Sequence, residues 1–99
     1  MMKFIKKYFR IKKLQYFKIS AYRYVNLNEV RSVRYVIEYD KQLFYTPILI
    51  IKFRKNNLKE YYLGFYLSSS FESAIEKASS IEQTIMLQQW RYYKAKYYD

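Results

Sequence analysis

The spacing of the apolar residues changes along this chain, and that change most constrains the fold. Over residues 15–67 apolar and polar residues alternate, or form short apolar runs, which is typical of β-strands. After the serines at 68–70 the apolar residues recur every three or four positions, which is the period of an α-helix. The 99 residues include one Gly and one Pro, so we expect short turns built from Asn, Asp, Ser and Lys.

The first part predicts about four sequential strands, at residues 15–25, 32–39, 43–53 and 58–67. The turns between them are expected at residues 26–29, 40–42 and 54–57, the last being suited to a hairpin because Asn tolerates positive φ. The third segment is apolar on both faces and is the best candidate for the central strand, although Pro47 argues against ladder pairing at its own position. Gly64 predicts a bulge or the close approach of a helix.

Two segments predict helices. Residues 3–14 place most of their apolar residues on one arc and most of their Lys and Arg residues on the other, with a strand as the competing interpretation. Residues 69–96 predict a long helix, which Ser69 and Glu72 would open as a capping box. Its apolar stripe consists of Phe71, Ala74, Ile75, Ala78, Ile81 and Ile85.

These elements together predict one α+β domain over residues 1–99. It comprises a basic segment at 1–14 with a short N-terminal helix, an antiparallel meander at 15–67 and a long C-terminal helix at 69–96 on one face of the sheet.

The charge of the chain is strongly positive and unevenly spread. The formal net charge is +11, and residues 1–23 contain eight Lys and Arg residues and no acidic residue. Such a segment favours contact with the phosphates of nucleic acid, which is salt-sensitive and insensitive to base sequence. The residues expected to bind are Lys3, Lys6, Lys7, Arg10, Lys12 and Lys13, with Arg54 and Lys55 as a second cluster. An acidic protein partner, a membrane surface and simple solubility are the alternatives.

Aromatic residues make up 22% of the chain, including 14 Tyr, and exceed what one small core absorbs. Leu87 and Trp90 lie off the apolar stripe of the second helix and need another partner surface. We expect Leu87, Trp90 and Tyr93 to form an interface, with a homodimer as the expected assembly. The interleaved Lys, Arg and aromatic residues at 90–98 also favour stacking on unpaired bases, for which ordinary cation–π packing is the alternative.

Several classes of chemistry are excluded. Without Cys or His there is no disulfide, thiolate, cysteine-based zinc site or imidazole catalyst, and one Gly leaves no Gly-rich phosphate loop. The carboxylates have no accompanying ligand cluster, so we expect no enzyme, metal or cofactor; a metal-dependent nuclease is the weakest of the hypotheses.

No membrane-spanning segment is expected, because the longest uncharged and mostly apolar run, residues 43–51, is far shorter than the roughly 20 residues required. The early lysines argue against a signal peptide, so we expect a cytoplasmic protein.

The runs YFKISAYRY, TPILIIKF and EYYLGFYL are rich in Tyr, Ile and Lys. In this style the whole chain resembles small orphan proteins of filamentous viruses that infect hyperthermophilic archaea. The resemblance implies a thermostable viral protein of the host cytoplasm, and it transfers no functional residue. The main hypothesis is therefore a stable, non-enzymatic binding protein that contacts nucleic acid. The alternative is a structural or protein-interaction component that self-associates through exposed aromatic residues.

Overall fold

The computed structural model describes residues 2–39, 44–63 and 70–98, with side chains from residue 6 onward in these ranges. The described part of the chain forms two α-helices, five strands and one short 3-10 helix. In chain order these are α1 (Met2–Gln15), β1 (Tyr16–Ser20), β2 (Arg23–Asn26), η1 (Leu27–Glu29), β3 (Val30–Tyr39), β4 (Tyr45–Phe53), β5 (Leu58–Tyr62) and α2 (Phe71–Tyr97).

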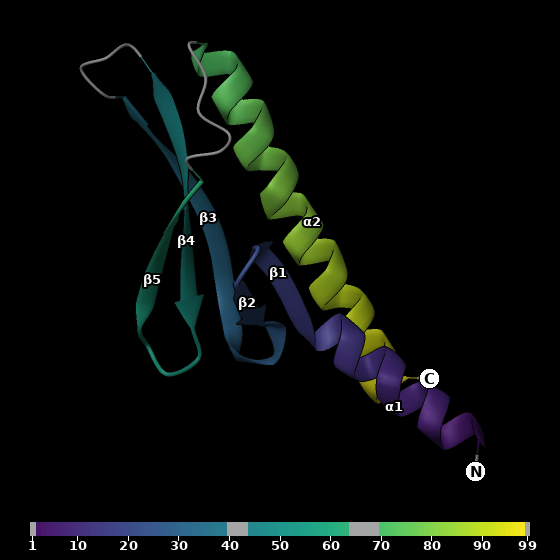
Figure 1. Cartoon of the computed structure of the whole chain (residues 1–99). Coiled ribbons are helices and arrows are strands. Elements are labelled where there is room, and N and C mark those ends of the chain that lie inside the picture. The colour runs from purple at the N-terminus through teal and green to yellow at the C-terminus, as the bar shows by residue number, and fades with distance from the viewer. Residues whose placement is uncertain (1, 40–43, 64–69, 99) are drawn as a thin grey trace.

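The strands form two antiparallel sheets, and α2 packs on them (Figure 1). Strands β1 and β2 pair as a hairpin, whereas β3, β4 and β5 form a meander with β4 in the centre. The N-terminal helix α1 lies beside the C-terminal half of α2. The molecule is elongated, measuring 57 × 26 × 22 Å, because α2 has 27 residues and extends about 40 Å. The predicted α+β class, with a long C-terminal helix on a meander and a short N-terminal helix, is confirmed.

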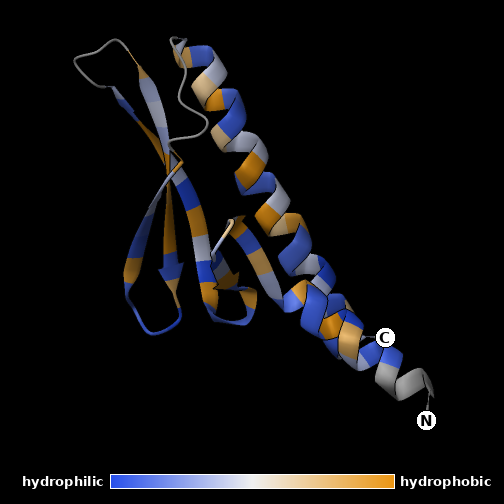
Figure 2. Ribbon diagram, in the orientation of Figure 1, coloured by the Kyte–Doolittle hydropathy of each residue, from blue (hydrophilic) through white to orange (hydrophobic). Residues whose placement is uncertain are grey.

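The hydrophobic core joins both sheets to α2. Its fully buried residues come from the end of β2, the 3-10 turn, the strands of the meander and the middle of α2; they include Val25, Leu27, Leu49, Ile51 and Ile85. Figure 2 shows hydrophobic residues along β4 and at intervals along α2. Ala74 and Ala78, from the predicted stripe, are also buried, whereas Phe71 at the start of the helix is half exposed. The stripe thus predicts most of the buried face of α2.

The helices begin close to where the sequence places them. The basic segment is helical rather than extended, and α1 exceeds the predicted 3–14 by one residue at each end. The N-cap of α2 is Ser70, whose hydroxyl accepts a hydrogen bond of 3.3 Å from the Ser73 N–H. Ser69, the expected N-cap, lies outside the described residues. Glu72 is in the first turn, where a carboxylate interacts favourably with the helix dipole.

The prediction of one strand over residues 15–25 is wrong. This segment is a hairpin, in which β1 and β2 are separated by a turn at Ala21 and Tyr22. The alternation of apolar and polar residues in the sequence continues through the turn. Tyr22 stands at a position where the alternation predicts an outward side chain, and its side chain is 95% exposed in the turn. Neither turn residue is Gly, Asn, Asp or Pro, so nothing in the local sequence marks the reversal. The described chain therefore has five strands in two sheets, not about four strands in one meander.

The turn predicted at residues 26–29 is confirmed as the 3-10 helix η1. The Asn26 side chain caps it by accepting a 3.0 Å hydrogen bond from the Asn28 N–H. The turn at 54–57 is also confirmed, and Asn56 adopts the positive φ of 63° that asparagine tolerates. The predicted turn at 40–42, the strand residues 64–67 and the proposed bulge at Gly64 lie outside the described residues.

Pro47 belongs to the central strand, opposite Ile37 of β3, which corrects the expectation that it would not pair. Its carbonyl accepts a hydrogen bond of 2.9 Å from the Leu63 N–H, on the β5 side. In a strand the N–H and C=O of one residue point to the same side, so the donor that proline lacks would face the β5 side as well. Strand β5 ends at Tyr62, one residue before Leu63, which lies opposite Pro47. The missing N–H of Pro47 therefore removes no hydrogen bond from the ladder between β4 and β3.

We expect Gln89→Ala to lower the free energy of unfolding by about 1–3 kcal/mol, because two part-buried carbonyls lose their donor. The Gln89 Nε2 atom donates to the carbonyl oxygens of Leu27, at 3.1 Å, and Val30, at 2.9 Å. Urea denaturation measures the change. Gln83→Ala is the control: Gln83 is exposed and bonds only within α2, to Ser79 Oγ at 3.4 Å. Equal losses of unfolding free energy in the two variants would contradict the stabilising effect of the two Gln89 hydrogen bonds.

Stability should decrease at alkaline pH because of Tyr61. Burial raises the pKa of its hydroxyl above the ordinary value of 10.0, against a smaller opposing effect of Arg23. Folding therefore favours the neutral phenol; this contribution is fully present below about pH 10 and is lost as the pH rises through the folded-state pKa. Urea denaturation between about pH 9 and 11 should show a shallower fall for Tyr61→Phe than for the exposed control Tyr22→Phe. Parallel curves would contradict this assignment.

Candidate nucleic-acid interface

Two glutamines on α2 position its C-terminal half. Gln88 Nε2 donates to the Leu14 carbonyl, at 3.0 Å, and to the Tyr16 carbonyl, at 3.2 Å, so it bonds the backbone where α1 ends and β1 begins. Gln89, the next residue, bonds the carbonyls on either side of η1. Because neighbouring helical residues point about 100° apart, these two side chains hold α2 against α1 on one side and against the sheets on the other.

A groove of about 420 Å³ lies between α1 and α2. It is lined by Arg10, Lys13 and Leu14 from α1 and by Trp90, Arg91 and Lys94 from α2. Trp90 is 59% exposed, and the Lys94 ammonium lies 5.2 Å from the centre of its indole ring. Four cationic side chains thus line one groove with an exposed aromatic ring, and no described residue that lines the groove is acidic.

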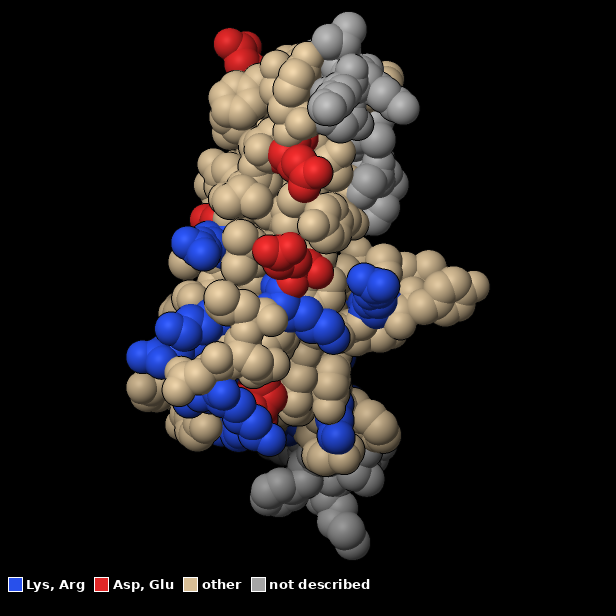
Figure 3. All heavy atoms as spheres, turned by 90° about the vertical axis from the view of Figure 1, so that its left-hand side faces the viewer, with Lys and Arg blue, Asp and Glu red and all other residues tan. Residues whose placement is uncertain are grey.

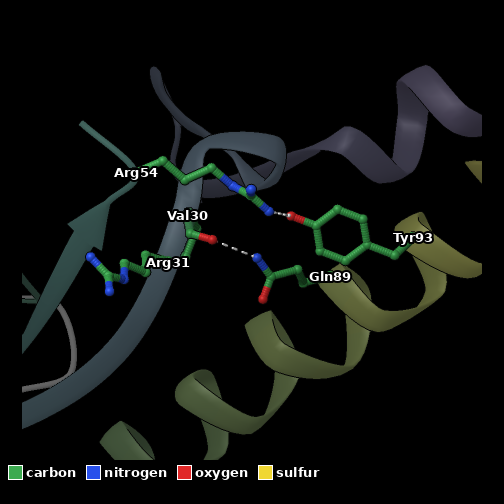
Figure 4. Close-up of a pocket in the computed structure, with 5 residues that line it drawn as sticks. All are labelled: Val30, Arg31, Arg54, Gln89 and Tyr93. Carbon is green, nitrogen blue, oxygen red and sulfur yellow. Dashed lines mark hydrogen bonds between the residues drawn. The ribbon is translucent and has the colours of Figure 1, made fainter. Parts of the chain in front are cut away.

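A second groove lies between α2, the start of β3 and the β4–β5 turn (Figure 4). The Arg54 guanidinium donates a 2.7 Å hydrogen bond to the Tyr93 hydroxyl and lies 6.0 Å from the centre of that ring. This hydrogen bond raises the pKa of Arg54 above its ordinary value. Arg31 points away from Tyr93, and its Nη1 atom lies 3.4 Å from Asn56 Oδ1.

Aromatic rings continue from this groove toward the end of α2. Tyr93 stacks on Tyr97, with 6.0 Å between the ring centres. The Lys96 ammonium lies 5.2 Å from the Tyr97 ring and 5.6 Å from the Tyr92 ring, and its hydrogen bond with Tyr92 raises its pKa. Tyr92 is buried and donates to Asn28 Oδ1 at 3.2 Å, so it holds the helix on the 3-10 turn.

The charges are segregated along the molecule. On the side that Figure 3 shows, Lys and Arg gather in the lower half, whereas Asp and Glu lie mainly in the middle and upper parts. Helix α2 has the same polarity, because Glu72, Glu76 and Glu82 are in its first half. Its last eight residues hold Arg91, Lys94 and Lys96 and no carboxylate. The two grooves lie at this basic end, where anions are favoured.

The structure divides the predicted cationic residues among several places. Arg10 and Lys13 line the α1–α2 groove, whereas Lys6 and Lys12 are exposed on α1, with Lys12 5.8 Å from the Tyr8 ring centre. Lys7 is half-buried. Arg54 and Lys55 belong to the β4–β5 turn on the other flank of α2. The side chain of Lys3 lies outside the described part of the structure.

The predicted interface residues separate in a similar way. Leu87 and Trp90 are about half exposed on α2. Tyr93 instead accepts a hydrogen bond from Arg54, and its ring packs against those of Tyr92 and Tyr97. Sequence reasoning included Arg91 and Lys94 in the interleaved pattern at 90–98 but did not name them with the cationic residues expected to bind. The signal was present, since Lys94 follows Trp90 by four positions and therefore shares its helix face.

Among the described residues there is no group of three or more carboxylates that could hold a metal ion. No helix in the described ranges is both long enough and apolar enough to span a membrane.

Comparisons with protein-family models, with curated proteins and with solved structures find no match to this chain.

The cations around Trp90 should be measurable through the fluorescence of this residue, the one tryptophan of the chain. The positive groove concentrates iodide and repels caesium, so we expect iodide to quench Trp90 more strongly than caesium does. Added NaCl should shrink the difference by screening the charges. The variant Lys94→Glu should lower the iodide quenching constant, whereas Lys18→Glu on β1 should leave it unchanged. Equal quenching by both ions would contradict the described groove.

Proposed function

We propose that this protein binds single-stranded nucleic acid, without catalysis and with little sequence preference, through the α1–α2 groove. One observation carries the proposal: Arg10, Lys13, Arg91 and Lys94 line one groove together with the exposed ring of Trp90. Non-specific binding of single strands requires these two components, namely cations that follow the phosphates and an aromatic ring on which a base stacks.

The cations supply the larger part of the affinity. Each neutralised phosphate releases condensed counterions, and this gain in entropy is independent of the base sequence. The segregated charge adds to it, because the carboxylates of α2 lie in its other half, away from the groove. An approaching polyanion is therefore attracted toward the basic end before any contact forms.

Trp90 favours a single strand over a duplex. A base is able to stack on an indole ring only when its face is free, and in a duplex both faces are covered by neighbouring bases. The Lys94 ammonium lies over the indole ring, so a base that stacks on that face would displace it, and the ammonium would then lie close to the phosphate of the stacked nucleotide. Tyr93 and Tyr97 provide further rings toward the second groove, where Arg54 is the nearest cation. Such a ligand agrees with the cytoplasmic location, and with the host cytoplasm for a viral protein, that the sequence predicts.

A second candidate function rests on the same exposed surface of α2. Met86, Leu87 and Trp90 are each about half exposed, and such side chains favour contact with another protein or another copy of the chain. In that case Trp90→Ala would reduce concentration-dependent association, and oligonucleotides would have no effect.

Fluorescence anisotropy with labelled oligonucleotides tests the main proposal. Single-stranded DNA and RNA should bind more tightly than their duplexes. Four contacted phosphates predict that log K falls with log salt with a slope of about −3. A flat salt dependence, or preference for a duplex, would contradict the proposal.

Variants assign the binding to the groove. Trp90→Ala should weaken binding by about 1–3 kcal/mol, with the salt slope nearly unchanged, because stacking releases no counterion. Arg91→Ala should instead make the slope shallower by about 0.7. Lys18→Ala, which removes one charge from β1, is the matched control and should leave single-strand affinity nearly unchanged. Equal effects of Arg91→Ala and Lys18→Ala would show that net charge alone attracts the oligonucleotide.

A further inference from the structure

The face of the meander that points away from α2 combines exposed apolar residues with charges of both signs. Leu49 and Ile51 of β4 belong to the core, as does Tyr61 of β5, and Val33 and Tyr35 of β3 pack against it. Side chains alternate between the two faces of a sheet, so their neighbours along each strand point the other way. This set, the outer face, comprises Ser32, Arg34, Val36, Glu38, Thr46, Ile48, Ile50, Lys52, Leu58, Glu60 and Tyr62.

Large apolar side chains on this outer face remain accessible. Leu58 and Tyr62 are each 59% exposed, and Val36 is 42% exposed. Ile50 is half-buried between them, and Ile48 is buried. These residues lie side by side across all three strands, because Val36 pairs with Ile48 and Ile48 pairs with Tyr62. Exposed apolar side chains gathered on a sheet, as Val36, Leu58 and Tyr62 are here, are typical of surfaces that another protein covers.

The charges on the outer face indicate which protein that is. Arg34 pairs with Ile50, and Ile50 pairs with Glu60, so one row across the sheet runs from a positive residue through an apolar one to a negative one. Consider a second copy of the sheet, packed face to face about a two-fold axis along β4. It places β3 opposite the partner's β5, and each Arg34 then faces Glu60 of the other copy. Ile50 meets its own equivalent on the axis, and the row is complementary to itself.

We propose that two copies of this chain associate through the outer face, with Arg34 of each copy paired to Glu60 of the other. The same arrangement sets Val36 against Tyr62 in the next row, so apolar side chains cover one another beside the ion pairs. The Tyr62 hydroxyl lies 3.4 Å from Glu60 Oε2, which helps to orient that carboxylate. This surface is separate from the α1–α2 groove. A dimer formed here therefore leaves the α1–α2 groove of each copy open to solvent.

Lys52 makes an unfavourable contact in this arrangement. It lies on β4 between Ser32 and Leu58, one row closer to the β4–β5 turn, and therefore faces its own equivalent across the axis. Its long side chain is able to extend from the rim of the face toward water, at some cost to affinity. The outer face is also small beside the 20–30 residues that each partner contributes to a standard interface, so we expect a weak dimer, with Kd of about 10–100 μM.

Sedimentation equilibrium of the full chain, from about 5 to 500 μM, tests the proposal. We expect a monomer–dimer equilibrium that Arg34→Glu and Glu60→Arg each weaken about tenfold or more, since each variant places like charges opposite one another. Lys52→Ala should strengthen the dimer. Trp90→Ala, which changes the other candidate surface, should leave the equilibrium unchanged. Far-UV circular dichroism verifies that each variant is folded.

The decisive measurement mixes the two single variants. In a heterodimer of the Arg34→Glu and Glu60→Arg chains, both cross-chain pairs are again of opposite sign, so association should return to about the wild-type level. Loss of folding in either variant would not produce such a rescue. A wild-type chain that stays monomeric throughout, a mixture that stays monomeric, or association lost in Trp90→Ala would overturn the proposal. Dimers that appear only when an oligonucleotide is added would overturn it as well.

Discussion

The packing of α2 against both sheets is the interaction on which the remaining structure depends. The β1–β2 hairpin and the β3–β4–β5 meander are separate sheets, and no ladder joins them among the described residues. A two-stranded hairpin is at best marginally stable alone, and the apolar face of the three-stranded meander needs a surface that covers it. Helix α2 provides it, because Ile85 packs in one cluster with Val25 from the hairpin side and with Leu49 and Ile51 from the meander.

Polar contacts fix where α2 lies along those sheets. Apolar packing is not directional, and a stripe of Ala and Ile tolerates small shifts along its axis. Gln88 and Gln89 remove that freedom by donating to backbone carbonyls at the end of α1 and around η1. Tyr92, bonded to Asn28, acts in the same way. The position of Trp90 relative to Arg10 and Lys13, and therefore the composition of the α1–α2 groove, follows from these contacts.

The two proposed surfaces lie on different layers of the molecule and have different physical characters. All charged residues that line the α1–α2 groove are basic, which suits a long polyanion but disfavours a second copy of the same groove. The outer face of the meander has one positive and one negative residue in a single row, which suits a copy of itself. A dimer through the outer face would carry two grooves, and two linked sites bind a long strand more tightly than one.

The sequence predicted several local features from chemistry close to each residue. The turn at 54–57 followed from the tolerance of asparagine for positive φ, and Asn56 adopts it. The helix at residues 3–14 followed from the separation of apolar and cationic residues on two arcs. The hairpin turn at Ala21 and Tyr22 was missed because alternation passes through it without a turn residue. Pro47 was misjudged because its effect depends on where β5 ends, which is a property of the neighbouring strand.

Local patterning was therefore sufficient for the α+β class, for most of the strands and for the face of α2 that is buried. It also identified Arg10, Lys13 and Trp90 as residues of interest, since charge and ring exposure depend mainly on the residue itself and its helical position. The tertiary structure alone decided that these residues from opposite ends of the chain share a groove, and that Arg54 bonds Tyr93 instead. It alone aligned Arg34 with Glu60 across three strands. Such pairings are set by strand register and helix docking, which depend on contacts between residues far apart in sequence.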